Sequence, residues 1–168
     1  MKAAQNLSER VGVVAASLGP MAGPEKRFVI IGGGPGGTAC ATHAARLGAR
    51  VTLIEKDIIG GAAHLLDCIP SKAMIATGGA MAMMKGAEEM GLAKVDVSLD
   101  FEALRERIIE IEQRLEGSVT SLLASQGVTL VEGVGRLVGP NTVEVSGTQE
   151  GTPTGDQWTL DADVIVLS

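Results

Sequence analysis

Cys68 and Lys72 are the two residues of this chain whose types and spacing could do redox chemistry. They lie in the run Asp67-Cys68-Ile69-Pro70-Ser71-Lys72, in which Pro70 favours the first turn of a helix. A helix start and an ammonium group one turn further on both stabilise a thiolate, so Cys68 could be a reactive cysteine. The carboxylate of Asp67 acts in the opposite direction. A packing role for Cys68, without redox chemistry, stays open as the alternative.

A second set of residues fits the binding of a dinucleotide. Gly32, Gly34 and Gly37 have the GxGxxG spacing, with Pro35 and Gly36 between the second and third glycines. In this motif the first glycine allows a tight turn, the second lets the backbone approach a pyrophosphate, and the third lets a helix pack closely on a strand. The phosphates would bind over the free N–H groups at the start of that helix.

Glu55 supplies the acidic partner that belongs with this fingerprint. It follows the next predicted strand, where a carboxylate accepts hydrogen bonds from ribose hydroxyls. An acid at this place favours an unphosphorylated adenosine ribose, so the sequence predicts FAD or NAD rather than NADP at this site. The spacing alone leaves the choice between FAD and NAD open.

The run from Gly60 to Lys72 resembles the redox-active loop and helix of the flavin-dependent disulfide reductases, the family of lipoamide dehydrogenase and glutathione reductase. In that family two cysteines of this loop form a disulfide beside the flavin. Here Ala63 occupies the first of the two positions and Cys68 the second. One sulfur cannot cycle through an intramolecular disulfide. The resemblance, which extends from residue 28 to residue 168, therefore implies a flavoprotein reductase, while Ala63 argues against disulfide chemistry.

The resemblance also implies which cofactors and residues take part. The first fingerprint of these reductases holds FAD, and NAD(P)H binds at a second fingerprint later in the chain. Lys72 would lie near the reactive edge of the flavin and stabilise electron density on the reduced ring. Cys68 would contact the flavin through its sulfur, and Gly135 would approach the flavin nucleotide. The cofactor-binding residues predicted by motif and resemblance are Gly32, Gly34, Pro35, Gly36, Gly37, Glu55, Lys56, Gly60, Gly61, Ala62, Lys72 and Gly135.

Three functions remain open on these grounds. The favoured one is an FAD-dependent NAD(P)H oxidoreductase that passes electrons from flavin directly to a small non-disulfide acceptor such as a quinone, as in the branch of the family that lacks the first cysteine. The second is a dihydrolipoamide dehydrogenase-like or soluble pyridine nucleotide transhydrogenase activity. The third is a non-catalytic FAD-binding module. Because the family's enzymes are much longer homodimers, we expect residues 26–168 to be a truncated FAD-binding domain, inactive alone and without the NAD(P)-binding and dimerisation domains.

The elements that must position these residues follow from the hydrophobic pattern. Segments 28–31 and 51–54 are short, β-branched apolar runs that are typical of strands buried in a parallel sheet. The segment 35–47 between them predicts a helix that stops at Gly48, which completes a right-handed βαβ unit. A further buried parallel strand is predicted at 164–167.

Two more helices are predicted in the middle of the chain. One begins at Pro70, bends at Gly78-Gly79 and uses its methionines as flexible core filler. The other is capped by Asp100 and runs to about residue 126. Its predicted apolar face consists of Leu104, Ile108, Ile111, Leu115, Val119 and Leu122.

The last third of the chain predicts strands. Segment 128–131 is a third strand, and alternating segments at 134–138, 142–146 and 157–161 predict an antiparallel meander with a loop over 147–155. The expected fold class is therefore α/β: a Rossmann-like FAD-binding domain with a central parallel sheet, flanking helices and an antiparallel β-meander.

Composition narrows the possible partners. The 168 residues include 14 basic and 20 acidic side chains, a net charge of −6, so nucleic acid is not an expected partner. The uncharged stretches are too short, or too rich in glycine and proline, to span a bilayer. Two cysteines make no disulfide framework, which favours the cytoplasm. No metal site is predicted, and residues 1–25 are expected to form a disordered or weakly structured extension.

Overall fold

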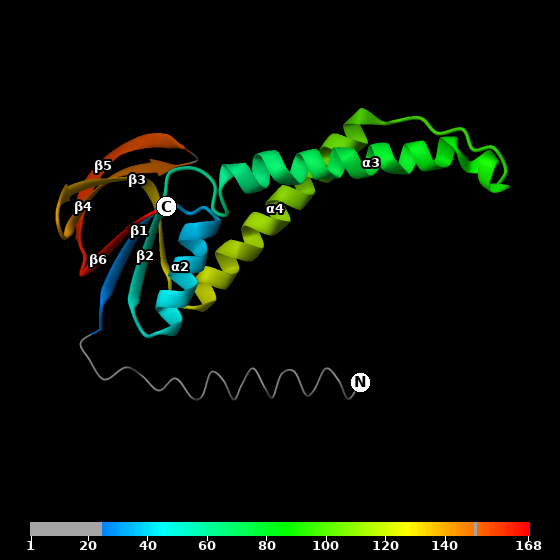
Figure 1. Cartoon of the computed structure of the whole chain (residues 1–168). Helices are drawn as coiled ribbons and strands as arrows, with labels where there is room; N and C mark the ends of the chain where they lie inside the picture. The colour runs from blue at the N-terminus through cyan, green and yellow to red at the C-terminus, as the bar shows by residue number, and fades with distance from the viewer. Residues whose placement is uncertain (1–24, 150) are drawn as a thin grey trace, which may run out of the picture.

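The computed structural model describes residues 25–149 and 151–168, so the expected extension over residues 1–25 lies outside it apart from Glu25. Figure 1 shows a twisted sheet with helices on one side and a helical arm that leads away from it. The elements in chain order are β1 (Arg27–Ile31), α2 (Pro35–Arg46), β2 (Arg50–Glu55), the π-helix η1 (Ala63–Cys68), α3 (Ile69–Lys85), the 3₁₀-helix η2 (Ala87–Met90), α4 (Phe101–Ser125), β3 (Thr129–Gly139), β4 (Thr142–Gln149), β5 (Thr152–Asp161) and β6 (Val164–Leu167).

The six strands form one sheet in the order β5-β4-β3-β2-β1-β6. Strands β3, β2, β1 and β6 are parallel, whereas β3, β4 and β5 pair antiparallel as a meander. The predicted α/β class is therefore confirmed. The βαβ unit of β1, α2 and β2 places the end of β1 and the end of β2 at the same edge of the sheet, where ligands of such folds bind.

Strand β3 serves both halves of the sheet. Its first residues, from Thr129 to Glu132, pair with β2, and its later residues pair with β4. The expectation of two separate strands at 128–131 and 134–138 is thus wrong. Gly133 explains the continuity: a Cβ there would lie 2.7 Å from the carbonyl oxygen of Ser146, so glycine lets β4 approach where β3 changes partner.

The expected loop over 147–155 is also wrong. Strand β4 continues to Gln149 and β5 begins at Thr152, so most of this polar stretch belongs to a hairpin. Backbone pairing, not hydrophobic burial, forms this hairpin, since β5 is exposed along almost its whole length. Pro153 is tolerated there because β5 is the edge strand.

The core lies in two layers on the sheet. On one face Ile30 and Leu53 pack against α2 and against Leu123 of α4, and the small residues Ala41 and Ala44 let α2 lie close to the strands. The second cluster, which joins the parallel strands to the meander, consists of Val29, Ile54, Val143, Val145 and Ala162. These clusters fix the strand ends that carry the candidate site.

The capped helix α4 agrees with its prediction at the start and departs from it at the end. Oδ1 of Asp100 accepts hydrogen bonds from the N–H groups of Glu102 and Ala103, each at 3.0 Å. Near the carboxyl end Leu123 is completely buried, while Leu122 is half exposed. The apolar face therefore shifts by one residue where the helix meets α2.

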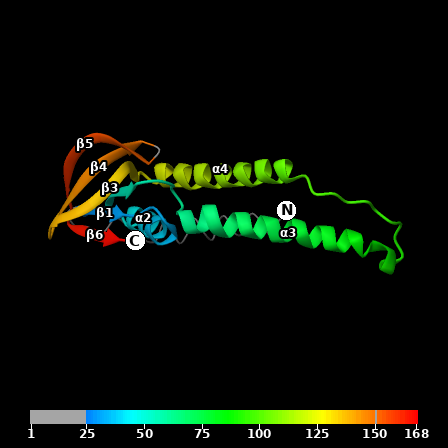
Figure 2. The same ribbon diagram turned by 90° about the horizontal axis from the view of Figure 1, so that it is seen from above.

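Helix α3 extends away from the sheet as an arm, and α4 crosses it obliquely and contacts it on the way back to the sheet (Figures 1 and 2). Helix α3 is continuous through Gly78-Gly79, so these two glycines do not interrupt it. None of its residues is buried, and Met74, Met83 and Met84 are at least 45% exposed. The methionines are therefore not core filler, because this helix projects away from the sheet.

Candidate dinucleotide site

The glycine fingerprint forms the turn between β1 and α2. Gly32 has a φ of +107°, and a Cβ there would collide with the carbonyl oxygen of Ser168. A Cβ at Gly37 would collide with the carbonyl oxygen of Gly32. These two positions accept only glycine, for the reasons that the motif predicts: a tight turn and a close helix.

Gly34 is the open position of the fingerprint. A Cβ there would have no neighbour within 4 Å in the described part of the chain, so the backbone faces free space. Helix α2 starts at Pro35, and its first internal hydrogen bond runs from the Thr38 N–H to the Gly34 carbonyl oxygen at 2.9 Å. The N–H groups before Thr38 have no partner within the helix. A pyrophosphate fits this cradle, because donors and a positive dipole end meet there.

Glu55, the last residue of β2, is fixed beside the fingerprint. Its Oε2 accepts a hydrogen bond from the Gly33 N–H at 2.6 Å. Its Oε1 accepts from the backbone N–H groups of Lys56 and Asp57, at 2.8 and 3.0 Å. Three donors thus orient the carboxylate, and Oε2, which accepts only one of these hydrogen bonds, keeps a lone pair for a ribose hydroxyl. Lys56 itself is exposed next to it.

Gly33 is the residue that sequence reasoning missed. Its N–H holds Glu55, and its carbonyl oxygen accepts the N–H of Gly60 at 2.8 Å. The fingerprint, the ribose acid and the Gly60-Gly61 turn therefore meet at one residue, Gly33. The GxGxxG spacing treats this position as free, so no pattern in the sequence points to it.

The Gly60-Gly61 turn packs directly on the fingerprint. Both residues have positive φ, +108° and +87°. A Cβ at Gly61 would lie 2.9 Å from Cα of Gly34. Ala62 follows as the exposed residue that precedes the π-helix η1. The structure thus brings Gly60 and Gly61 together with the fingerprint, and the predicted binding of the cofactor by Gly60, Gly61 and Ala62 stays a prediction.

The helical segment that carries Cys68 begins earlier than predicted. The π-helix η1 spans Ala63–Cys68 and continues into α3, so the helix start lies near Ala63 and not near Pro70. The N–H groups of His64 and Leu65 already donate to the carbonyl oxygen of Gly61. The positive end of the helix dipole is therefore about one turn before Cys68, and it favours the thiolate less than the sequence suggested.

The side chains of Cys68 and Lys72 lie one helical turn apart, and both are exposed. A π-helix joins residues five positions apart by hydrogen bonds, so Ala63 and Cys68 lie across one turn from each other. Leu65, which is 1% exposed, anchors the segment in the interior and contacts the Gly60 turn. The position of the missing sulfur is therefore next to the sulfur that remains.

Gly135 lies on β3, opposite Val145 of β4. A Cβ at Gly135 would lie 3.0 Å from Cγ1 of Ile31, so close packing against β1 already accounts for the glycine. Its predicted approach to the flavin nucleotide stays a prediction.

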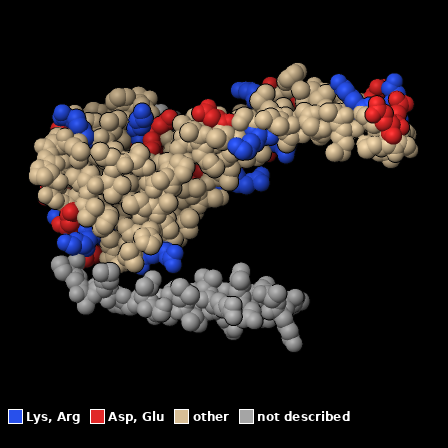
Figure 3. All heavy atoms as spheres, in the orientation of Figure 1, with Lys and Arg blue, Asp and Glu red and all other residues tan. Residues whose placement is uncertain are grey.

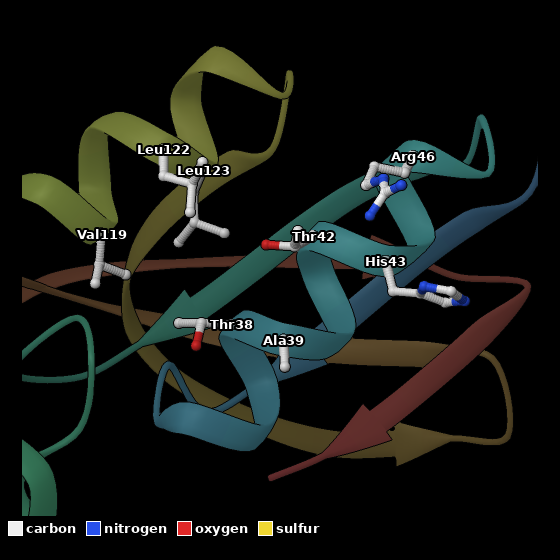
Figure 4. A pocket seen from close by; sticks show the side chains of 8 residues that line it. All are labelled: Thr38, Ala39, Thr42, His43, Arg46, Val119, Leu122 and Leu123. Atoms are coloured by element: carbon white, nitrogen blue, oxygen red, sulfur yellow. The ribbon is translucent and has the colours of Figure 1, made fainter. Parts of the chain in front are cut away.

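A shallow hollow of about 380 Å³ lies elsewhere, between α2 and α4. Figure 4 shows its lining, which comes from these two helices and includes Thr38, Thr42 and Val119. It contains neither Glu55 nor Cys68.

In residues 25–149 and 151–168 no group of three or more His, Cys, Asp or Glu could hold a metal ion. No helix of that part is long and apolar enough to cross a membrane.

The fold and the fingerprint define a dinucleotide-binding α/β domain of the oxidoreductase type. The pyridine nucleotide-disulphide oxidoreductase family matches residues 26–168, and the chain belongs to this family. The resemblance inferred from the loop and the fingerprint is therefore confirmed.

Individual relatives are dihydrolipoyl dehydrogenases. The enzyme of Geobacillus stearothermophilus is 38% identical over 121 residues, which is 72% of this chain and 26% of that protein. The enzyme of Haloferax volcanii is 42% identical over 125 residues, 74% of this chain and 26% of that protein. The crystal structure of LpdA from Mycobacterium tuberculosis superposes with a TM-score of 0.72 at 29% identity, covering 84% of this chain and 31% of LpdA. The chain thus spans about a quarter of the length of the relatives that it matches.

Proposed function

We propose that this chain is the FAD-binding domain of an FAD-dependent NAD(P)H oxidoreductase. The observation that carries the proposal is the backbone of Gly33, whose N–H binds Glu55 and whose carbonyl oxygen binds the Gly60-Gly61 turn. Lipoamide dehydrogenases of this family use FAD and NAD(P)H, and the resemblance to them supports FAD as the ligand of this fingerprint. The family and the relatives named above are oxidoreductases, which supports an enzyme rather than a non-catalytic module.

Each part of the site has a role in this proposal. The backbone around Gly34 and Gly36 would bind the pyrophosphate, with Pro35 starting the helix above it. Glu55 would accept the ribose hydroxyls, flanked by Lys56. The flavin supplies electron transfer when bound. Lys72 would stabilise negative charge near it, and Cys68 would lie beside it.

Two substrates compete in the proposal: dihydrolipoamide, which would give electrons to NAD through the flavin, and a quinone, which would take electrons from NAD(P)H. The relatives favour dihydrolipoamide, since those named above are dihydrolipoyl dehydrogenases. Ala63 favours a quinone-like acceptor that takes electrons directly from the flavin, because dithiol exchange needs a second sulfur. The identity of the relatives outweighs the single difference at Ala63. Dihydrolipoamide is therefore the first candidate substrate and the quinone the second.

Steady-state turnover by the complete protein separates the two. Dihydrolipoamide with NAD, menadione with NADH or NADPH, and transfer from NADPH to an NAD analogue are measured in parallel. Oxidation of dihydrolipoamide without reduction of menadione supports the first substrate, and the reverse supports the quinone. Transfer between nucleotides alone would point to transhydrogenase chemistry, and a flavin-loaded protein inactive in all three assays would contradict the enzyme proposal.

A homodimer of the complete protein in the cytoplasm is part of this proposal. The resemblance to a family of homodimers supports the dimer. Both cysteines are free, as is usual in a reducing compartment.

A further inference from the structure

The hairpin of β4 and β5 reaches the loop that follows Glu55. Strand β3 changes its partner from β2 to β4 at Gly133, which pairs with Gly147, so the end of β4 lies beyond its last pair with β3. There the Oγ1 of Thr148 donates a hydrogen bond to the carbonyl oxygen of Lys56 at 3.3 Å, across 92 positions of sequence. The turn of the hairpin accordingly lies beside the loop after β2 (Figures 1 and 2).

The shape of the hairpin directs Thr148 toward that loop. The pairing of β4 with β5 shifts its register between Ser146 and Thr148, and Gly155 in the shifted stretch of β5 has a φ of +89°. Such a bulge bends a strand and changes the direction of its side chains. A Cβ at Gly147 would lie 2.8 Å from the Oγ1 of Thr154, so glycine is needed where the two strands come close.

Neither burial nor ion pairing fixes this end of the hairpin. Strand β5 is exposed along almost its whole length, and Figure 3 shows the surface over the meander as mostly uncharged. In the part of the chain that the structure describes, no ion pair joins the hairpin to the loop after β2. A Cβ at Gly151 would lie 4.0 Å from Oδ1 of Asp57, so the turn packs on this loop. The hydroxyl of Thr148 links the two.

Thr148 and Glu55 bind opposite ends of one peptide group. The carbonyl of Lys56 and the N–H of Asp57 belong to the same planar unit. The carbonyl accepts from Thr148, and the N–H donates to Oε1 of Glu55 at 3.0 Å. Hydrogen bonds in such a chain polarise one another, so a donor on the carbonyl strengthens the N–H as a donor. The hydroxyl also fixes the plane of the peptide, and with it the direction of the N–H toward the carboxylate.

We propose that Thr148 is a positioning residue for the adenosine half of the dinucleotide, and that it acts through the Lys56–Asp57 peptide on Glu55. The inference rests on the proposed function, in which Glu55 binds the ribose. The backbone engages Oε1 of Glu55 twice, which turns Oε2 toward Gly33 and the space for a ribose hydroxyl. Loss of the Thr148 hydroxyl would free this peptide to rotate, and the carboxylate would be held less firmly.

The first test compares FAD affinities by titration of the flavin-free complete protein. Thr148→Val removes the hydroxyl at nearly constant shape and is expected to raise the dissociation constant about threefold, as for the loss of a weak hydrogen bond. Thr148→Ser keeps the hydroxyl and should restore the wild-type affinity. Thr159→Val, at an exposed site of β5 opposite Glu144, is the matched control and should have no effect. Equal affinities of Thr148→Val and the wild type would overturn the proposal.

A double-mutant cycle shows whether Thr148 acts through Glu55. In a Glu55→Ala background the peptide has no carboxylate to orient, so Thr148→Val is expected to cause little further loss of FAD affinity. The same threefold loss in that background would mean that Thr148 acts by another route, for example by touching FAD itself, and would refute the proposal.

Amide hydrogen exchange at Asp57, measured without FAD, gives a readout that does not depend on the cofactor. The Asp57 N–H is expected to lose protection in Thr148→Val and to keep it in Thr148→Ser and Thr159→Val. Unchanged protection in Thr148→Val would contradict the link. A wild type that binds no FAD would overturn the proposed function and this role of Thr148 together. A wild type that binds FAD no better than Thr148→Val would end this inference alone.

Discussion

Ala63 is the residue that most limits the chemistry of this site. The π-helix places it across one turn from Cys68, where a second sulfur would complete a dithiol. Its methyl group leaves Cys68 with no redox partner in the loop, and Cys40 belongs to α2 in another part of the fold.

Restoring that sulfur tests the geometry. Ala63→Cys, after mild oxidation, is expected to form an intramolecular disulfide with Cys68 and leave one free thiol per chain on titration after denaturation. The wild type, with both cysteines free, keeps two. Leu66→Cys is the control, because residues two apart on a helix point to different sides. Three free thiols in the Ala63 variant would show that the two positions are not adjacent.

At the scale of elements, the cap of α4 has a measurable energetic role. Asp100→Ala removes two hydrogen bonds to the first turn and is expected to lower the free energy of unfolding by about 1 kcal/mol. Urea denaturation measures the change. Asp96→Ala, an exposed aspartate in the preceding segment, is the matched control and should have little effect. Equal effects of the two substitutions would mean that capping does not stabilise α4.

Elements with a strong local signal were predictable from the sequence. Each of these elements is recognisable from a few consecutive residues: the apolar runs of β1 and β2, the glycine turn and the Asp100 cap. The predicted βαβ unit, and the place of Glu55 at the end of β2, were therefore confirmed. The role of Gly33 depends on three segments that meet only in the fold. The pairing of β3 with two different neighbours and the exposure of α3 also depend on tertiary arrangement, which periodicity does not encode.

At the scale of the whole molecule, one ion pair joins the first and last strands. Asp163, just before β6, accepts the backbone N–H of Arg27 at 2.8 Å and pairs with its guanidinium. These hydrogen bonds, the backbone one first, lower the pKa of Asp163, and the carboxylate raises the pKa of Arg27. Arg27 and Asp163 are 136 residues apart in the sequence, and their contact holds β6 against β1.

The sign of the resulting pH dependence follows from that lowered pKa. The ion pair stabilises the fold at pH values above the ordinary aspartate pKa of about 4. This stabilisation is lost as the pH falls through the lower pKa that Asp163 has in the folded protein. Asp163→Asn should therefore lower Tm at neutral pH, and the gap to the wild type should close in acid. Thermal scans across this range measure it, with Asp96→Asn as the control. A gap that persists unchanged at low pH would contradict the ion pair.

We propose that the cradle of Gly32–Gly37, closed by Glu55, binds a flavin nucleotide. The direct measurement is the absorbance of the complete protein titrated with FAD, beside Glu55→Gln and the control Glu132→Gln, the residue that pairs with Glu55 on β3. We predict a flavin-coloured wild type, affinity about tenfold weaker for Glu55→Gln because a charged hydrogen bond is lost, and no change for Glu132→Gln. A folded wild type that stays colourless with FAD, or equal affinities for all three proteins, would contradict the account.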